Sequence, residues 1–226
     1  MSNKKVTSLE VAKRAGVSQS AVSRVFTPGA SSSKKTNDLV RKAAAELGYR
    51  PNVLARSLIT GKSRIIGLVV AYLDNYFYPE ALELLSSALQ KKGYHVLIFM
   101  SGNKEGDIAD AVDEILDYQV DGIIAASVSM SSDLAKRCAS AGVPVVLFNR
   151  TQDDDRLSAV TSDNVLGGQK VARFLMAGGH KRIGYIAGWE GASTQRDREK
   201  GFCDELKRNG QSLYAREIGN FNLRSE

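Results

Sequence analysis

The side chains best suited to nucleophilic or metal chemistry are few in this sequence and stand far apart. The two cysteines, Cys138 and Cys203, form no CxxC pair. The two histidines, His95 and His180, lack neighbours at the spacing of a metal site. The motifs GxSxG, HExxH, GxxxxGK[ST] and GxGxxG, which mark hydrolases, zinc peptidases, P-loop proteins and dinucleotide-binding enzymes, do not occur. We therefore expect no metal, no cofactor and no enzymatic activity.

Basic side chains are concentrated in one part of the chain. Residues 1–64 contain 13 Lys/Arg and 3 Asp/Glu, a net charge of +10, whereas the other 162 residues contain 18 basic and 22 acidic side chains, a net charge of −4. Clustered cations suit nucleic acid, because binding releases the counterions condensed on its phosphates. A charge run can equally be a solvated surface, so the asymmetry alone leaves both interpretations open.

The basic region must position these charges on short helices. Residues 8–15 have apolar side chains at helical spacing, and Gly16 is placed to end the helix. Ser18 can cap a second helix with an apolar side. A helix, a turn of about three residues and another helix form the helix-turn-helix pattern. A third helix is expected over residues 34–47, ended by Gly48.

A short helical segment is predicted over residues 52–58, after Pro51. It is shorter than an isolated helix that is stable in water, so we expect it to order only when something packs on it. Residues 60–63 predict a linker.

From residue 65 onward, apolar β-rich runs alternate with amphipathic helices. Strands are expected over 65–71, 95–100, 122–126 and 143–148, and helices over 79–92, 104–118 and 131–141. Apolar strands separated by helices predict a parallel sheet covered on both faces. A second unit is expected after residue 161, with helices over 164–177 and 194–209 and strands over 183–187 and 215–218.

Nothing in the sequence predicts a membrane protein or a secreted one. No run of about 18 apolar residues occurs. The basic N-terminal residues are not followed by the apolar segment of a secretory signal. We therefore expect a cytoplasmic protein.

Specific residue strings carry more information than periodicity does. In the basic region they are VTSLEVAKRAGVS at 6–18, AVSRV at 21–25, LGYRPN at 47–52 and ARSL at 55–58, and further along they are IGLV at 66–69, DGII at 121–124, SDN at 162–164 and GHKRIG at 179–184. With these strings the whole chain resembles the LacI/GalR family of transcriptional regulators. The resemblance implies an all-α helix-turn-helix head and an α/β body similar to the two-lobed periplasmic binding proteins. Family members continue for another hundred or more residues, so we expect the C-terminal part of the body to be missing.

The resemblance also implies a division of the chain. Residues 1–60 would form the DNA-binding domain, including a hinge helix at 52–58. Residues 61–226 would form an incomplete domain for effector binding and dimerisation.

In this family the second helix of the head lies in the major groove of DNA. Gln19, Ser20 and Arg24 match the family's base-reading positions, and glutamine and arginine can bind the edges of adenine and guanine. Phosphate contacts are expected from Ser18, Ser23, Ser33, Thr36, Tyr49 and Asn52. In the hinge, Leu58 would insert between base steps of the minor groove, with Ala55 beside it. The alternatives are a solvated helix face and a Leu58 that packs on the body.

Ligands of open parallel sheets bind beyond the carboxyl ends of the strands. The resemblance implies an effector site with Phe77 and Tyr78 after the first strand, Asn149 after the fourth, and Asp163 and Arg198 in the second unit. Aromatic side chains suit a sugar ring or a base, and Asn149 stands where many relatives have aspartate. The alternatives are core or dimer-face aromatics, a surface charge at Arg198, and a helix cap at Asp163.

The implied function is transcriptional repression. The protein would bind a palindromic operator in double-stranded DNA as a homodimer or homotetramer, in association with the bacterial nucleoid. A small-molecule effector, a sugar or a nucleoside-like metabolite, would control that binding. An activator or dual regulator would carry the same head, and a solute-binding protein would need an export signal in place of the basic region.

Overall fold

The computed structural model describes residues 6–27, 29–51, 61–71, 73, 77–101, 105–128, 130–152 and 157–219. The chain forms two compact units, Met1–Gly61 and Lys62–Glu226, called here the head and the body. The predicted hinge helix, with Asn52, Ala55 and Leu58, lies outside the described residues.

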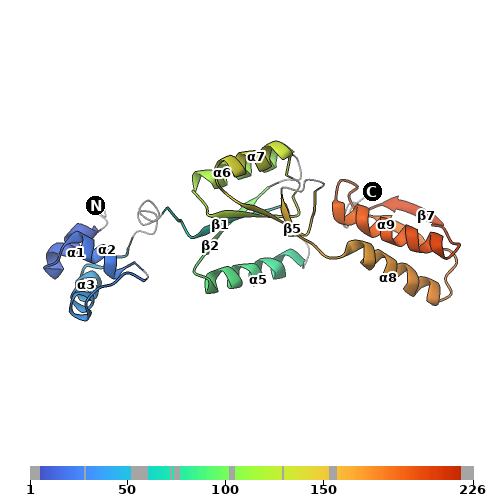
Figure 1. Ribbon diagram of the computed structural model, residues 1–226. Coiled ribbons are helices and arrows are strands. Elements are labelled where there is room, and N and C mark those ends of the chain that lie inside the picture. The colour runs from blue at the N-terminus through green and yellow to red at the C-terminus, as the bar shows by residue number, and fades with distance from the viewer. Residues whose placement is uncertain are drawn as a thin grey trace. The chain divides into compact units, whose positions relative to one another are not determined.

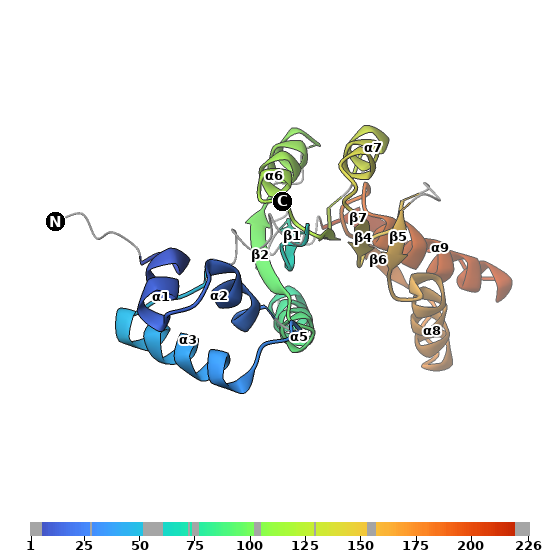
Figure 2. The same cartoon turned by 60° about the vertical axis from the view of Figure 1, so that its left-hand side comes forward.

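The head consists of three helices, α1 (Ser8–Ala15), α2 (Gln19–Val25) and α3 (Lys34–Leu47) (Figures 1 and 2). Side-chain caps fix where each begins. Thr7 and Glu10 form a reciprocal capping box on α1, while the hydroxyls of Ser18 and Ser33 accept hydrogen bonds from the first turns of α2 and α3. Gly16 and Gly48 end α1 and α3 with left-handed backbone. The predicted bounds of the first and third helices, 8–15 and 34–47, are therefore confirmed.

A small apolar core holds the three helices together. Val11, Val22 and Val40, one from each helix, are completely buried, and Phe26 contacts Tyr49 with ring centroids 5.7 Å apart at its margin. Only valines and alanines are fully buried in this cluster. The residues not needed for this core are thus left on the surface for binding.

The larger sheet of the body has five parallel strands in the order β2-β1-β3-β4-β5. They are β1 (Ile65–Val70), β2 (His95–Met100), β3 (Gly122–Ala126), β4 (Val145–Phe148) and β5 (Ser158–Val160). Helices α6 (Glu105–Asp117) and α7 (Ser132–Ser140) cover one face, and α5 (Phe77–Lys91) covers the other (Figure 1). The predicted parallel sheet with helices on both faces is confirmed.

Successive residues of each strand serve the two faces. In β1, Val69 packs in the core below α6 and α7, whereas Leu68 and Val70 pack toward α5. Gly67 leaves room for Ile115 of α6, since a Cβ there would lie 2.6 Å from the Ile115 Cγ2. This alternation explains why both faces read as apolar in the sequence.

Strand β5 was not expected from the sequence. All three of its residues are exposed, and it pairs only with β4, at the edge of the sheet. A short strand that is exposed on both sides has no alternating apolar pattern. The sequence therefore predicts no strand here, only the start of the next part of the chain after residue 161.

The first residues of the body are tied to the start of β3. The Asp121 carboxylate accepts hydrogen bonds from Ser63 N (2.8 Å), Ser63 Oγ (3.0 Å) and Arg64 N (3.2 Å). Arg64 has left-handed backbone (φ 54°), and its guanidinium lies over the Tyr94 ring. The chain therefore joins the sheet at a fixed point.

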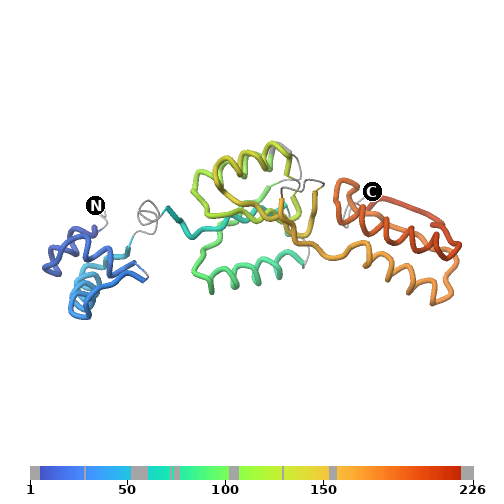
Figure 3. Tube along the Cα trace, viewed as in Figure 1, coloured from blue at the N-terminus to red at the C-terminus, as the bar shows by residue number. Residues whose placement is uncertain are grey.

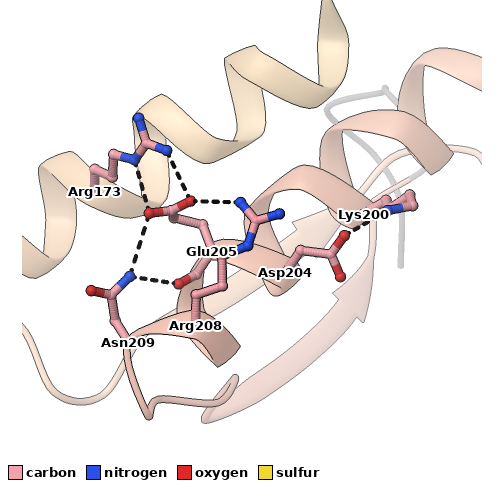
Figure 4. Close-up of polar contacts among 6 residues, drawn as sticks. All are labelled: Arg173, Lys200, Asp204, Glu205, Arg208 and Asn209. Atoms are coloured by element: carbon pink, nitrogen blue, oxygen red, sulfur yellow. Dashed lines mark hydrogen bonds and ion pairs between the residues drawn. The ribbon is translucent and has the colours of Figure 1, made fainter.

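A second, two-stranded parallel sheet is formed by β6 (Gly184–Ala187) and β7 (Ala215–Ile218), with α8 (Asn164–Ala177) and α9 (Ser193–Arg208). The two helices run side by side (Figure 3). Glycines permit this approach: a Cβ at Gly168 would overlap the Arg198 carbonyl oxygen, and one at Gly201 would overlap the Val165 carbonyl oxygen. Farther along, Arg173 of α8 forms a two-point ion pair with Glu205 of α9 (Figure 4).

Candidate functional site

One side of α2 is polar and exposed. Gln19, Ser20 and Arg24 are all exposed, while Val22 and Val25 face the head core. Ser23 is exposed as well. The three predicted base readers thus lie together on the outer side of the second helix, which is the side that a groove could receive.

Contacts within the head orient part of this face. Gln19 Nε2 donates to Ser8 Oγ at 2.9 Å, which links it to α1. Ser18 Oγ accepts from Ala21 N and lies 3.0 Å from Ser20 Oγ. The Arg24 guanidinium, by contrast, makes no hydrogen bond or ion pair with any residue in the described part of the chain. Its guanidinium is therefore available to an outside acceptor.

The predicted phosphate-contacting residues have structural roles of their own. Ser33 caps α3, and its Oγ lies 2.9 Å from Thr36 Oγ1. Tyr49 is half-buried against Phe26. Ser33 is exposed and Thr36 is half-buried, and their position at the start of α3 is compatible with a phosphate contact.

A second cluster lies where β3 and β4 end. Ser127 and Asn149 follow these neighbouring strands directly, and both have left-handed backbone, with φ of 58° and 70°. Asn149 Nδ2 donates to Ser127 Oγ at 3.2 Å, and Ser127 N donates to Phe148 O at 3.1 Å. Left-handed backbone costs a non-glycine residue about 1 kcal/mol or more, and such strain gathers at binding sites.

A continuous chain of hydrogen bonds crosses this cluster from α5 to α9. Asn149 Nδ2 donates to Tyr78 Oη at 2.7 Å, and the Asn149 carbonyl accepts from Thr161 Oγ1 at 3.2 Å. Asn164 Nδ2 donates to Thr161 Oγ1, and Asn164 Oδ1 accepts from Arg198 Nε at 2.8 Å. Three predicted effector residues, Tyr78, Asn149 and Arg198, are thereby brought into one network, called here the ligand cluster.

The aromatic pair at the start of α5 divides its roles. Tyr78 is buried and contributes its hydroxyl to the ligand cluster. Phe77 is 49% exposed and stacks on Phe148, with centroids 6.0 Å apart and planes 8° from parallel. Phe77 thus offers an apolar ring face beside the polar chain.

Asp163 occupies a different environment from the other predicted effector residues. It is exposed, and its carboxylate accepts the Leu166 N–H at 2.9 Å as the N-cap of α8. Its neighbour Asn164 is buried and contacts Arg198. The sequence analysis missed Asn164 and Thr161, although the SDN string drew attention to the segment.

Sequence reasoning also missed Arg150. It follows Asn149 directly, is only 3% exposed, and places its guanidinium carbon 5.0 Å from the centroid of the Trp189 ring. Its Nη1 is buried without a hydrogen-bond partner in the described parts of the chain. An arginine immediately after an apolar strand was the available signal.

Several contacts order the loop between β6 and α9, which contains Trp189, and the first turns of α9. A Cβ at Gly191 would overlap the Trp189 indole, so glycine is needed where the loop folds around this ring. Buried Gln195 accepts the Gly188 N–H at 2.8 Å and donates to Glu199, which Arg216 also contacts. Hydrogen bonding from Arg216 lowers the pKa of Glu199, so this carboxylate stays ionised.

Within the described residues, no three His, Cys, Asp or Glu side chains are grouped as metal ligands. In the same part of the chain, no helix is long and apolar enough to cross a membrane.

Two family models match the chain. Residues 7–52 match the bacterial regulatory proteins of the lacI family, and residues 63–222 match the periplasmic binding proteins and sugar binding domain of the LacI family. The maltose regulon regulatory protein MalI of Escherichia coli (strain K12) is 34% identical over 213 residues, which are 94% of this chain and 62% of that protein. The sucrose operon repressor of Streptococcus mutans serotype c is 35% identical over 185 residues, 82% of this chain and 57% of that repressor.

Solved structures agree with this match. The lac repressor dimer bound to operator and the anti-inducer ONPF has a TM-score of 0.85 at 27% identity, covering 97% of this chain and 67% of that one. The complex of the transcriptional regulator CelR with cellobiose has a TM-score of 0.63 at 26% identity, covering 96% and 67%. The resemblance seen in the sequence is confirmed: the chain belongs to the LacI family of bacterial regulatory proteins.

Proposed function

We propose that the protein represses transcription by binding a palindromic operator through α2, under the control of a small-molecule effector bound by the body. The observation that carries this proposal is the exposed polar side of α2, where the Arg24 guanidinium makes no hydrogen bond or ion pair with any other described residue. The net charge of +10 over residues 1–64 supplies the electrostatic attraction to DNA. A related repressor with a TM-score of 0.85 is bound to operator in its crystal structure, which supports the same use here.

Sequence selection from random duplexes tests the proposal. Arg24→Ala should lose about 1–3 kcal/mol of discrimination at one base pair, because a bidentate contact to guanine is lost. Arg14→Ala is the matched control, since Arg14 already pairs with Glu46 at 2.6 Å. No enrichment of a palindrome by the unaltered protein would refute the proposal, and unchanged selectivity of Arg24→Ala would refute the role of that residue.

The hinge residues Asn52, Ala55 and Leu58 belong to the same proposal. Leu58 would enter the minor groove between base steps, and the hinge would order only on DNA. Leu58→Ala should weaken operator binding more than binding to random DNA; equal losses on both would contradict the wedge.

The effector is proposed to be a sugar or a related metabolite, with a nucleoside-like compound as the alternative. An exposed Phe77 ring beside the hydrogen-bonding groups of the ligand cluster suits an apolar sugar face and its hydroxyls. Two relatives regulate maltose and sucrose genes by name, and another is complexed with cellobiose. Thermal shift with sugars and nucleosides tests this, because a ligand at 100 times its Kd adds about 2.7 kcal/mol of stability.

Assembly as a homodimer is proposed through β2 and α5. Strand β2 lies at the edge of the sheet, with Ile98 and Met100 exposed, and Leu84 of α5 is exposed as well. A palindromic operator calls for a two-fold arrangement of heads. Ile98→Asp should shift the sedimentation coefficient toward the monomer; an unchanged value would place the interface elsewhere.

Repression, rather than activation, is proposed from the named relatives, and a promoter–reporter assay with and without the protein distinguishes the two. A protein that binds chromosomal DNA would act in the cytoplasm, at the bacterial nucleoid.

A further inference from the structure

Arg150 differs from three ion-paired arginines of the body, because none of the described carboxylates pairs with it. Arg173 pairs with Glu205, Arg216 with Glu190 and Glu199, and Arg137 with Asp113. No described carboxylate pairs with Arg150, although its side chain is the most deeply buried of these four. Burying a guanidinium without a counter-charge is unfavourable, so a structural role alone does not account for this residue.

The contact that the described residues make with the Arg150 guanidinium is neutral. The Trp189 ring is its one described partner, and the Asn149 amide donates to Tyr78 and Ser127 instead of offering a negative charge. Arg198, the second guanidinium of the cluster, also has an uncharged partner, the Asn164 amide oxygen. The Asp163 carboxylate is exposed and caps α8. Two cations therefore face described partners that carry no charge.

The position of Arg150 is fixed on both sides. Gly191 allows the Trp189 indole to lie where it does, and Thr151 N, one residue after Arg150, donates to Ser193 Oγ of α9 at 2.9 Å. A buried donor held in place without an acceptor is preorganised for an acceptor that arrives from outside.

We infer that Arg150 binds an anionic group of the effector beside the ligand cluster, and that this group is a phosphate or a carboxylate on a sugar. The planar guanidinium can give two parallel hydrogen bonds to the two oxygens of such a group, and ion pairing cancels its charge. The Phe77 ring would take the apolar face of the sugar. This inference rests on the proposed effector-controlled regulator and narrows the chemical class of its effector.

Calorimetric titration of the protein with matched ligands tests the inference. The probes are glucose, glucose 6-phosphate, glucuronate and inorganic phosphate, and sucrose with sucrose 6-phosphate, at about 0.15 M salt. A sugar carrying the anion should bind about 10- to 100-fold more tightly than its neutral parent, the range expected for hydrogen bonds to charged groups. Binding of inorganic phosphate as tight as that of the phosphorylated sugar would overturn the sugar part of the inference.

Two variants separate Arg150 from general electrostatics. Arg150→Met keeps an unbranched side chain beside Trp189 and should abolish the preference for the anionic ligand. Arg182→Met is the matched control, because Arg182 also lies over an aromatic ring, Tyr214 at 4.1 Å, and should leave the preference intact. A preference that survives Arg150→Met would overturn the inference.

The unaltered protein gives an independent readout if the variant fails to fold. The affinity for a phosphate ester should fall below about pH 6, where the phosphate dianion takes up a proton and becomes a monoanion, while the affinity for the neutral sugar stays level. Neutral sugars that bind as well as their phosphates, and release operator, would overturn this inference and leave the proposed function standing. If no compound of either kind changes operator binding, the proposed effector control fails as well.

Discussion

The Glu205 carboxylate lies almost fully buried where α8 meets α9. Arg173 donates to both of its oxygens, at 2.8 and 3.1 Å, and Asn209 donates to one of them (Figure 4). Hydrogen bonding from Arg173 is the largest influence and lowers the pKa of Glu205. The folded protein therefore binds the proton of this residue less readily than the unfolded chain does.

This shift predicts a pH dependence of stability. The contribution of Glu205 is complete above its unfolded pKa of about 4.3 and is lost as the pH falls through the lower folded value. Thermal melts between about pH 5 and pH 3 should show a falling Tm, and Glu205→Gln should melt lower at neutral pH and flatten part of that fall. Asp204→Asn is the control, because Asp204 is 42% exposed against 8% for Glu205 and its pair with Lys200 is solvated. An unchanged pH slope in Glu205→Gln would contradict the prediction.

Single residues could be predicted from sequence where local geometry decides their role. Ser18 was placed by the helix pattern that follows it, and it does cap α2. The roles of Arg150 and Asn164 were missed, because their burial and partners are set by segments distant in the sequence. Asp163 and Asn164 are adjacent and both polar, so only the tertiary structure shows which one faces Arg198.

At the scale of elements, the crossing of α8 and α9 sets the geometry around Arg198. Gly168 and Gly201 bring the two backbones into direct contact, and the hydrogen bond from Arg198 to Asn164 bridges the helices at this place. The spacing between the two helices and the position of Arg198 are therefore linked.

Gly201→Ala should damage both stability and ligand binding. Its methyl group would overlap the Val165 carbonyl of α8, and relieving the overlap should cost about 1–3 kcal/mol in the free energy of unfolding, measured by urea denaturation. Gly167→Ala, in the same helix pair, faces open space and should instead stabilise by up to about 1 kcal/mol, because alanine favours helix. If the two variants behaved alike, close helix packing would not be what Gly201 provides.

The elements themselves were largely predictable, because periodicity, caps and glycine stops all agree. Apart from the hinge helix, which lies outside the described residues, the predicted ends of the helices and strands lie within two residues of the observed ones. The exception is β5, whose three exposed residues have no pattern, and which forms because β4 supplies a free edge.

For the whole molecule, the proposed regulation requires that effector binding to the body and operator binding to the head be thermodynamically coupled. An effector that changes operator affinity by a given factor must have its own affinity changed by the same factor when operator is bound. Couplings of this kind are about 1–3 kcal/mol, or roughly 5- to 150-fold.

This reciprocity can be measured directly. Operator binding should be titrated with and without saturating effector, and effector binding with and without saturating operator, in one buffer. The two ratios should agree within error, and Asn164→Ala, which removes the partner of Arg198, should reduce effector affinity without altering the affinity of the free protein for operator. Independent binding of the two ligands would exclude control by the effector.

The basic N-terminal region and the parallel sheet could be predicted from charge and pattern, whereas Tyr78, Asn149 and Arg198 were predicted only through the family resemblance. The hydrogen-bond network that joins these three residues could not be predicted. Its members come from α5, from the ends of β3 and β4, and from α8 and α9, separated by more than a hundred residues. Only the strand order β1-β3-β4 brings them to one edge.

The hydrogen bonds of Asp121 to Ser63 and Arg64 lie at the start of β3. Asp121 immediately precedes that strand and holds Ser63 and Arg64, while Ser127 immediately follows it in the ligand cluster. A strand held by neighbours on both sides is stiff along its length, and this one spans roughly 17–20 Å. If an effector bound at the ligand cluster shifts Ser127 along the strand axis, we expect β3 to carry that shift to Asp121, and so to Ser63 and Arg64, the residues that precede β1.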